Sequence, residues 1–236
     1  MKKNNFSQFA IFMAGLIIAA NFYSQDNREG TTMQQSNEDI IQLPTPKLQS
    51  ETSVEEALHK RRSIRNYTKE PISLDEVSQI LWAAQGITEK SYGLKTSPSA
   101  GALYPLEVYL VAANVKDISE GIYKYNPRNH SIKKIDDGDK RIDISNASLR
   151  QDAIEECSAL VIITAIYERT SVKYGDRAER YVHMEVGHVG QNIYLQAVSL
   201  RIGTVMMGAF RDEELKKVFK LPANEFPLAI YPLGKI

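Results

Sequence analysis

The stretch Pro98-Ser-Ala-Gly-Ala-Leu-Tyr-Pro105 leads directly into the apolar run Leu106-Glu-Val-Tyr-Leu-Val-Ala-Ala113. The apolar run predicts a strand, and the small residues before it predict a loop without bulky side chains. Such a loop allows backbone N–H groups to approach a flat or anionic ligand closely. An ordinary surface turn has a similar composition, so the rest of the chain has to decide between a binding loop and a turn.

Two serine–glutamate pairs on the N-terminal side of this stretch mark helix starts. Ser53 precedes Glu56 by three residues, and Ser73 precedes Glu76 by the same distance, which is the spacing of a capping box. The second helix continues with apolar residues at helical spacing and ends near Gly86. Residues 87–97 are then expected to form a loop that leads into the small-residue stretch.

Strand patterns dominate on the C-terminal side of the small-residue stretch. Residues 121–126 and 131–136 alternate between apolar and polar side chains and predict a hairpin. Residues 158–167 are apolar on both faces, as in a central buried strand. The remaining expected elements are a short helix over 149–156, a strand over 203–210 followed by a helix from Asp212, and a last strand over 226–234.

The longest predicted element is a helix over residues 176–201, in which apolar residues recur at steps of three and four. Gly187 and Gly190 lie inside it and each destabilise a helix by about 1 kcal/mol relative to alanine. They predict that another backbone passes close by, in this chain or in a partner. His183 and His188 are five residues apart and do not share a helix face, so packing or hydrogen bonding is favoured over a metal site.

The N-terminal part of the chain is expected to lie outside the folded domain, which is assigned to 52–236. Lys2 and Lys3 precede an apolar run over residues 9–20, and small Ser24 follows, which is typical of a secretory signal peptide over residues 1–25. An uncleaved anchor is the alternative, but the run is shorter than the roughly 20 residues that span a bilayer. The sequence predicts a periplasmic or secreted protein without a stable membrane span, with residues 26–51 as a polar tether or extended arm.

The charge balance excludes one class of function. The chain has 29 basic and 29 acidic side chains, whereas a general nucleic-acid binder needs a basic excess. Cys157 is the only cysteine, and its apolar surroundings predict a buried structural thiol in preference to a nucleophile. The sequence therefore predicts neither a nucleic-acid partner nor a metal site.

Several motifs of the domain occur in one order. They are Arg61-Arg-Ser-Ile-Arg65, Pro98 to Pro105, a long helix with internal glycines, Gly203 through Gly208-Ala-Phe210, and Pro232-Leu-Gly234. Together they resemble the nitroreductase-like flavoprotein superfamily, and more closely its SagB/ThcOx-type dehydrogenase branch. The resemblance covers about residues 50–236. It implies an α+β fold with a central mixed, mainly antiparallel sheet flanked by helices, built as an intertwined homodimer with FMN at the interface.

The resemblance also implies roles for individual residues in binding FMN. The first motif would contact the phosphate, the ribityl chain and the pyrimidine edge of the ring through Arg61, Arg62, Ser63 and Arg65. The small-residue loop would approach the flavin, often that of the other subunit, through Pro98, Ser99, Ala100, Gly101 and Leu103. Gly208 and Ala209 match the position whose backbone N–H faces flavin N5, where a donor stabilises charge as hydride arrives or leaves. Lys235 stands near the place of a phosphate-binding cation.

Lys173 and Tyr174, just before the long helix, look like the pair proposed as acid/base residues in azoline dehydrogenases. Dehydrogenating an azoline requires loss of hydride and removal of a proton from the neighbouring carbon, which gives such a pair a task. The alternative is that the two side chains only cap the helix.

These observations favour an FMN-dependent oxidoreductase that transfers hydride to or from flavin N5. Its substrate would be a small molecule or a peptide-derived group, handled by a SagB-type dehydrogenase or a nitroreductase-like enzyme. The alternative is an exported flavin-binding protein without turnover. A solute-binding module is disfavoured, because the chain is too short for two lobes.

Overall fold

A computed structural model describes residues 40–236 of the chain. The expected signal peptide over residues 1–25 and the first part of the expected tether lie outside these residues. Within residues 40–236, no helix combines the length and the apolar character needed to cross a bilayer.

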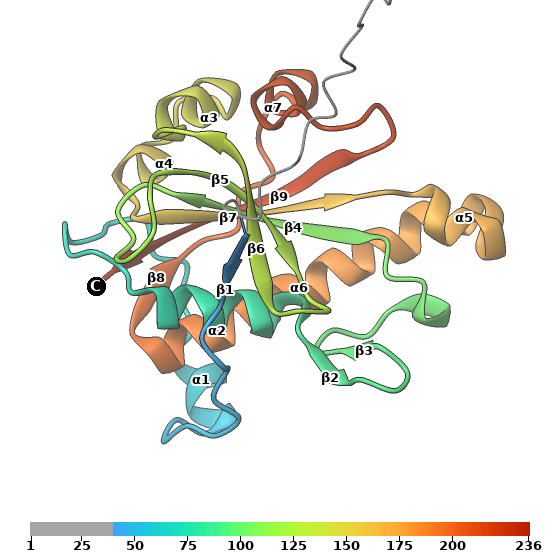
Figure 1. The fold of residues 1–236 in the computed structure, drawn as a ribbon, viewed down its shortest axis with the longest axis horizontal. Coiled ribbons are helices and arrows are strands. Elements are labelled where there is room, and N and C mark those ends of the chain that lie inside the picture. The colour runs from blue at the N-terminus through green and yellow to red at the C-terminus, as the bar shows by residue number, and fades with distance from the viewer. Residues whose placement is uncertain (1–39) are drawn as a thin grey trace, which may run out of the picture. The chain divides into compact units, whose positions relative to one another are not determined.

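A seven-stranded sheet forms the centre of the described domain, in the order β1-β6-β5-β4-β7-β9-β8 (Figure 1). Every neighbouring pair in it is antiparallel. All residues of β7 are buried, which confirms the expected central strand. The strands are β1 (Ile40–Gln42), β4 (Leu106–Ala112), β5 (Gly121–Asn126), β6 (Ser131–Asp137), β7 (Ala159–Ala165), β8 (Ile202–Thr204) and β9 (Phe226–Lys235).

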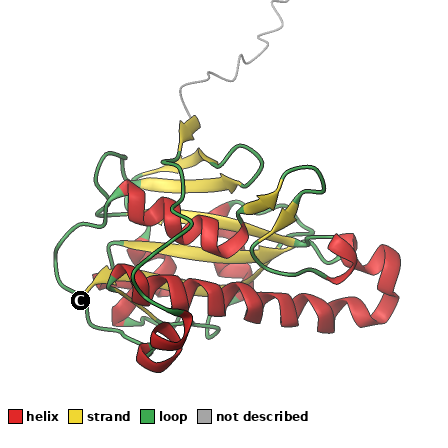
Figure 2. Cartoon of the chain, turned by 90° about the horizontal axis from the view of Figure 1, so that it is seen from below, coloured by secondary structure: helices red, strands yellow, loops and turns green. Residues whose placement is uncertain are grey.

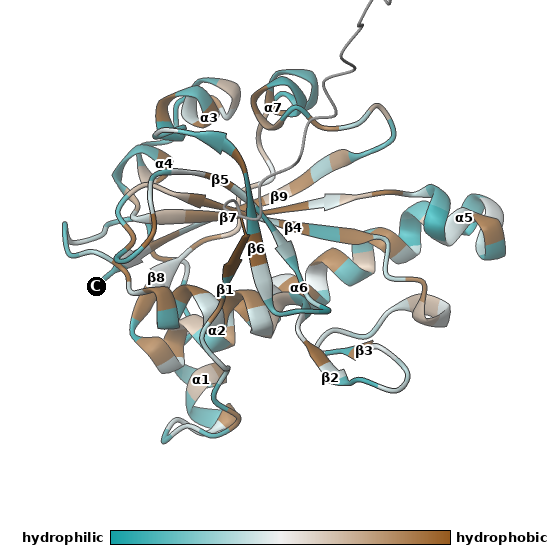
Figure 3. Cartoon of the chain, in the orientation of Figure 1, coloured by the Kyte–Doolittle hydropathy of each residue, from teal (hydrophilic) through white to brown (hydrophobic). Residues whose placement is uncertain are grey.

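Helices cover both faces of this sheet (Figures 1 and 2). The helices are α1 (Val54–Lys60), α2 (Leu74–Gln85), α3 (Arg141–Ala147), α4 (Asp152–Glu156), α5 (Glu168–Tyr174), α6 (Ala178–Leu200) and α7 (Asp212–Phe219). Because side chains alternate across a strand, Leu110 of β4 packs in the core beneath α2 and α6, whereas Tyr109 and Val111 pack beneath α3, α4 and α7. Figure 3 shows apolar residues along the central strands that separate these two cores.

Three elements differ from the expectation. Residues 87–97 contain a small hairpin, β2 (Ile87–Glu89) with β3 (Leu94–Lys95), where a loop was expected. The expected helix over 149–156 begins only at Asp152. Leu149 and Arg150 have φ values of 60° and 56°, which interrupt a right-handed helix. Helix α3, which precedes it, was not predicted from the sequence.

The expected strand over 203–210 is also shorter than predicted. Pairing of β8 with β9 ends at Thr204, and beyond it only Met207 forms an isolated bridge, with Ile230. At the Ser53 box, the Ser53 hydroxyl accepts a hydrogen bond from the Glu56 N–H, but the Glu56 carboxylate pairs with Lys60. The Ser73 box is complete.

The segment before α1 lies against the domain. Strand β1 pairs with β6 at the edge of the sheet, and the Leu43 N–H donates to the His130 carbonyl. Farther along, the Gln79 side chain bonds both the N–H and the carbonyl of Lys47 at 2.8 and 3.0 Å. Residues 40–47 are therefore held on the domain by hydrogen bonds of their backbone groups to β6, His130 and the Gln79 side chain.

The two glycines inside α6 have different surroundings. A Cβ atom on Gly190 would overlap the Tyr231 hydroxyl, so a side chain from β9 makes the close approach, not a backbone as expected. A Cβ atom on Gly187 would have no atom within 4 Å in residues 40–236. The single-chain structure therefore explains Gly190 and leaves Gly187 on an open face.

Cys157 is a buried thiol, as the sequence predicted, with 1% of its surface exposed. Burial raises the pKa of the Cys157 thiol to about 12. Because the thiolate is the reactive form, we expect the folded protein to resist N-ethylmaleimide at about pH 8 and to react once unfolded. Intact-mass measurement with and without denaturant tests this, and a labelled native protein would contradict it.

Candidate functional site

The side chain of Tyr194 in α6 contacts part of the arginine-rich segment and the chain after β8. The guanidinium carbon of Arg61 lies 5.1 Å from the centre of the Tyr194 ring. The Tyr194 hydroxyl is 3.1 Å from Ser63 Oγ and accepts a 2.8 Å hydrogen bond from the Met206 N–H. The name arginine group is used below for Arg61, Ser63, Tyr194 and Met206 together with Arg62, Arg65, Gly208 and Ala209.

Several donors of the arginine group remain available to a ligand. Within residues 40–236, the guanidinium groups of Arg61 and Arg65 have no hydrogen-bond acceptor, and the exposed N–H groups of Gly208 and Ala209 have none either. Arg62 differs, because its Nη1 atom donates to the carbonyls of His59 and Arg61 at 3.0 and 2.8 Å. Arg62 therefore helps to end α1.

A pocket of about 270 Å³ lies beside the arginine group. Its lining includes the cationic residues Lys60, Arg62 and Arg201, together with Tyr194 and Thr204. Thr204 Oγ1 is buried and has no hydrogen-bond partner in the described part of the chain. Glu56 also lines the pocket and pairs with Lys60. The other two cations, Arg62 and Arg201, and the orphaned hydroxyl fit the phosphate of a flavin nucleotide.

Lys235 is not among the residues that line this pocket. Its ammonium group pairs with the carboxylate of Glu76, the residue that completes the capping box of α2. This ion pair attaches the end of β9 to the start of α2, which gives Lys235 a structural role. The expected contact of Lys235 with phosphate stays a prediction.

The small-residue loop lies against α5. A Cβ atom on Gly101 would lie 3.0 Å from Lys173 Nζ and 3.0 Å from the Tyr174 hydroxyl. Gly101 has a φ of 63°, and the non-glycine residues Ala102 and Tyr104 also have positive values of 55° and 47°. Such backbone strain persists where surrounding contacts enforce it, and it is concentrated at functional sites.

Four hydrogen bonds that involve a side chain hold this strained loop. Tyr104 N–H donates to Ser99 Oγ at 2.9 Å, and the Tyr104 carbonyl accepts from Arg169 Nη1 at 3.1 Å. The Tyr104 hydroxyl accepts from the Lys95 N–H at 3.2 Å. The Ala100 N–H donates to the carboxylate of Glu185 at 2.9 Å. Residues 98–104 with Lys173, Tyr174 and Glu185 are called the loop group below.

Lys173 and Tyr174 do not cap the long helix. They belong to α5, whose C-cap is Gly175, and a short 3-10 turn (Gly175–Arg177) separates them from α6. Lys173 is exposed, with Nζ 5.5 Å from the centre of the Tyr174 ring, and that ring packs edge-on against Tyr181. Both polar groups thus face Gly101 of the loop.

Helix α5, which carries Lys173 and Tyr174, lies at one end of α6, and Tyr194 lies toward the other end (Figure 1). Lys173 and Tyr174 precede the first residue of this helix, which runs from Ala178 to Leu200. At the usual rise per residue, Tyr194 lies about 24 Å along it. One chain therefore brings the expected site residues together as two separate groups.

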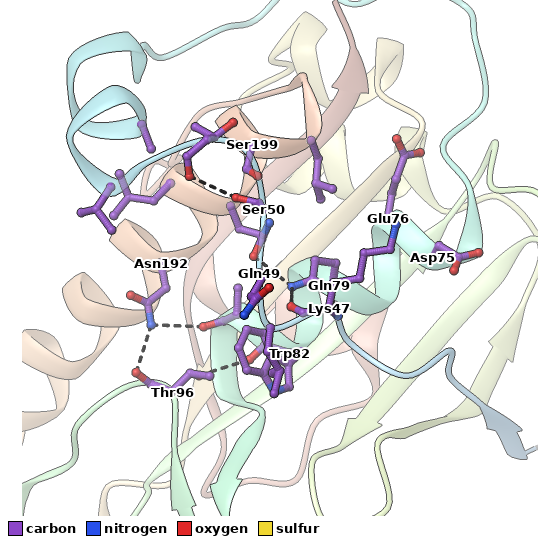
Figure 4. Close-up of a pocket in the computed structure, with 18 of the residues that line it drawn as sticks. Lys47, Gln49, Ser50, Asp75, Glu76, Gln79, Trp82, Thr96, Asn192 and Ser199 are labelled. Atoms are coloured by element: carbon purple, nitrogen blue, oxygen red, sulfur yellow. Dashed lines mark hydrogen bonds between the residues drawn. The ribbon is translucent and has the colours of Figure 1, made fainter.

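The larger cleft of the described structure belongs to neither group (Figure 4). It has a volume of about 860 Å³ and lies between residues 45–54, α2 and the C-terminal half of α6. Asn192 of α6 donates across it to the carbonyls of Ala83 and Thr96 at 3.1 and 3.3 Å. Its labelled polar residues are mainly amides and hydroxyls, with two carboxylates, Asp75 and Glu76, and one lysine, Lys47. None of the residues expected to bind a cofactor or to move a proton lines this cleft.

Comparison with known proteins decides the family. The model of the Nitroreductase family matches residues 58–235, which is most of the chain. The chain belongs to the nitroreductase family. A protein of Methanocaldococcus jannaschii whose name places it among the nitroreductases is 47% identical over 197 residues, which cover 84% of this chain and 98% of that protein.

More distant relatives of this nitroreductase-family chain have more specific names. The microcin B17-processing protein McbC of Escherichia coli is 23% identical over 174 residues, which cover 71% of this chain and 64% of McbC. A Ralstonia eutropha structure named as a nitroreductase superposes with a TM-score of 0.74 at 24% identity, covering 84% of this chain and 89% of that chain. The NADPH:FMN oxidoreductase of Vibrio harveyi superposes with a TM-score of 0.56 at 19% identity, covering 77% and 68%.

These comparisons confirm the family and the α+β nitroreductase fold that the sequence motifs predicted. They identify the chain as a nitroreductase-family oxidoreductase. Sequence reasoning missed several residues of the two groups and their pocket: Lys60, Glu185, Tyr194, Arg201 and Thr204. None of these residues stands in a recognisable motif, since each reaches its group only through the packing of α1, α6 and β8.

Proposed function

We propose that this protein is an FMN-dependent oxidoreductase that works as a homodimer. The observation that carries the proposal is the arginine group, in which the guanidinium group of Arg61, unpaired within the described residues, lies over the Tyr194 ring, and the Met206 N–H, two residues before Gly208, donates to the Tyr194 hydroxyl. Family membership supports a flavin, since the related V. harveyi protein is named for FMN. Bound FMN would supply the hydride donor or acceptor at N5.

In this proposal the chain's own residues bind and orient the cofactor. Arg61 and Ser63 both contact Tyr194, and Arg65 follows two residues later in the same segment, which has no regular secondary structure. Guanidinium groups bind phosphate and ring oxygens bidentately and stay charged. The N–H groups of Gly208 and Ala209 supply donors where negative charge develops during hydride transfer.

The loop group supplies the proton chemistry. Lys173 Nζ and the Tyr174 hydroxyl lie together beside Gly101, where either atom can accept or return the proton that leaves the substrate carbon. The absence of a side chain on Gly101 keeps this position open.

The distance between the two groups supports the homodimer. With about 24 Å of α6 between Tyr194 and the start of that helix, one chain does not place Lys173 beside the arginine group. A second copy, placed with its loop group against the first copy's arginine group, would complete the site. Met206 and Val172 expose apolar side chains beside the two groups, at 43% and 81%. Exposed apolar surface of this kind favours burial in an interface.

The proposed substrate is a small molecule or a peptide-derived group. The name of McbC describes a protein that processes microcin B17, which supports a peptide-derived azoline as one substrate class. Export, expected from residues 1–25, would separate the enzyme from cytoplasmic nicotinamide nucleotides, and it too is a proposal. Purified protein is expected to be yellow, to bleach on reduction and to recover with an oxidised substrate. Bleaching without any recovery across a substrate screen would favour a flavin-binding protein without turnover.

We expect Arg61→Ala and Arg65→Ala to lose most bound flavin. Removing one charged hydrogen-bonding partner of a phosphate or ring oxygen lowers affinity by about 1.5–3 kcal/mol, or roughly 10- to 150-fold. Flavin absorbance per protein after gel filtration measures the loss. Arg128→Ala, an exposed arginine in the turn after β5, is the matched control. Normal flavin content in both site variants would refute the cofactor assignment.

A further inference from the structure

Glu185 is a buried acid that the proposed chemistry does not use. It lies in α6 with only 3% of its surface exposed. Its Oε1 atom accepts a 2.9 Å hydrogen bond from the Ala100 N–H of the loop. Burial raises the pKa of the Glu185 carboxyl, and the Ala100 N–H, the Ser99 hydroxyl, His188 and Lys95 oppose this increase.

Burial of the Glu185 carboxylate is unfavourable unless polar partners replace the water that it loses. Within the described part of the chain, no lysine, arginine or histidine nitrogen forms an ion pair with the Glu185 carboxylate. Its hydrogen-bond partner is instead the Ala100 N–H at the start of the loop. The carboxyl therefore serves the loop and not an ion pair.

The loop needs external contacts to keep its shape. Gly101, Ala102 and Tyr104 all have positive φ values, and two of these residues carry side chains that disfavour them. Arg169 of α5 holds the C-terminal end of the loop through the Tyr104 carbonyl. Glu185 of α6 holds the N-terminal end through Ala100, so the strained residues lie between two fixed points.

We propose that Glu185 is a positioning residue, whose carboxyl holds Ala100 so that Gly101 stays against Lys173 and Tyr174. The 3.0 Å distances from a Gly101 Cβ position to Lys173 Nζ and to the Tyr174 hydroxyl leave little room for movement of the loop. The consequence for turnover rests on the proposed function, whereas the consequence for the loop does not.

Amide hydrogen exchange of the peptide covering residues 98–105 tests the proposal without substrate. Glu185→Ala is expected to speed exchange in this peptide by about tenfold, as loss of one hydrogen bond to a charged group predicts. Glu185→Gln keeps an acceptor oxygen and is expected to restore slow exchange. Glu179→Ala, an exposed acid on the same helix, is the matched control.

Turnover of the flavin-loaded enzyme is the second readout. Glu185→Ala is expected to lose turnover, and Glu185→Gln is expected to recover it. Unchanged exchange in Glu185→Ala, or equally fast exchange in Glu185→Gln, would overturn the proposal. If Glu185→Ala does not fold, Glu185→Asp replaces it, and exchange as slow as in the natural protein would count against the proposal. A natural protein that binds no flavin refutes the proposed function, while the exchange result still decides the role of Glu185.

Discussion

Lys173→Ala is expected to keep its flavin and to lose turnover by roughly 10²–10⁴-fold, the usual contribution of a positioned acid or base. Flavin should stay bound because Lys173 belongs to the loop group, whereas the arginine group holds the cofactor in our proposal. Flavin absorbance and steady-state turnover on the same preparation measure the two effects. Lys116→Ala is the matched control, since this exposed lysine follows the opposite end of β4 from the loop.

Mixed dimers test whether the two groups of one site come from different copies. When Lys173→Ala and Arg61→Ala chains are combined, one of the two sites receives both changes and the other receives neither. Turnover should then recover to about half that of the natural dimer, per mixed dimer. Two sites that are each built within one chain would both stay defective, and no recovery would be seen.

Gly190→Ala is expected to destabilise the fold by about 1–3 kcal/mol, the usual effect of overpacking a well-packed core. The new methyl group would overlap the hydroxyl of Tyr231, which is fully buried and has no room to move away. Improved helix propensity offsets at most about 1 kcal/mol of this loss. The Tyr231 ring packs edge-on against Tyr194 at 6.2 Å, so the overlap should also disturb the arginine group.

A second substitution isolates the cause. The Tyr231 hydroxyl has no hydrogen-bond partner in residues 40–236, so Tyr231→Phe alone should be neutral or stabilising. The double variant Gly190→Ala with Tyr231→Phe should recover about 1–2 kcal/mol, within the range seen for contacting residues. Denaturant unfolding of the four proteins measures the coupling, and strict additivity would contradict the proposed overlap.

Gly187→Ala is the control within the same helix. No atom of residues 40–236 lies within 4 Å of its Cβ position. Helix propensity alone should therefore raise stability by up to about 1 kcal/mol. A loss of stability would instead place atoms of a second copy against this face of α6.

The sequence predicted the strands and helices whose patterns depend on local periodicity. Strand β7 is apolar on both faces, and α2 has a complete capping box, so both were identified from short stretches. The breaks at Leu149 and Arg150 were missed, because leucine and arginine both disfavour positive φ values and so give no signal of such a turn in the sequence.

The sequence likewise predicted some residues of the candidate site and missed others. Arg61, Ser63 and Gly101 belong to contiguous motifs and were identified from them. Tyr194 and Glu185 are single positions on a long helix, where a tyrosine or a glutamate has no distinctive spacing. Their partners, Met206 and Ala100, are 12 and 85 residues away in the sequence. Only folding brings such pairs together.

The separation of the two groups along α6 has a consequence for how the protein would be assayed. With each site divided between two copies, as we propose, a single chain in solution is catalytically silent although fully folded. Specific activity would then fall on dilution, with a midpoint at the dissociation constant of the dimer, while circular dichroism stayed unchanged. The separation of the two groups along one helix would thus make activity depend on protein concentration.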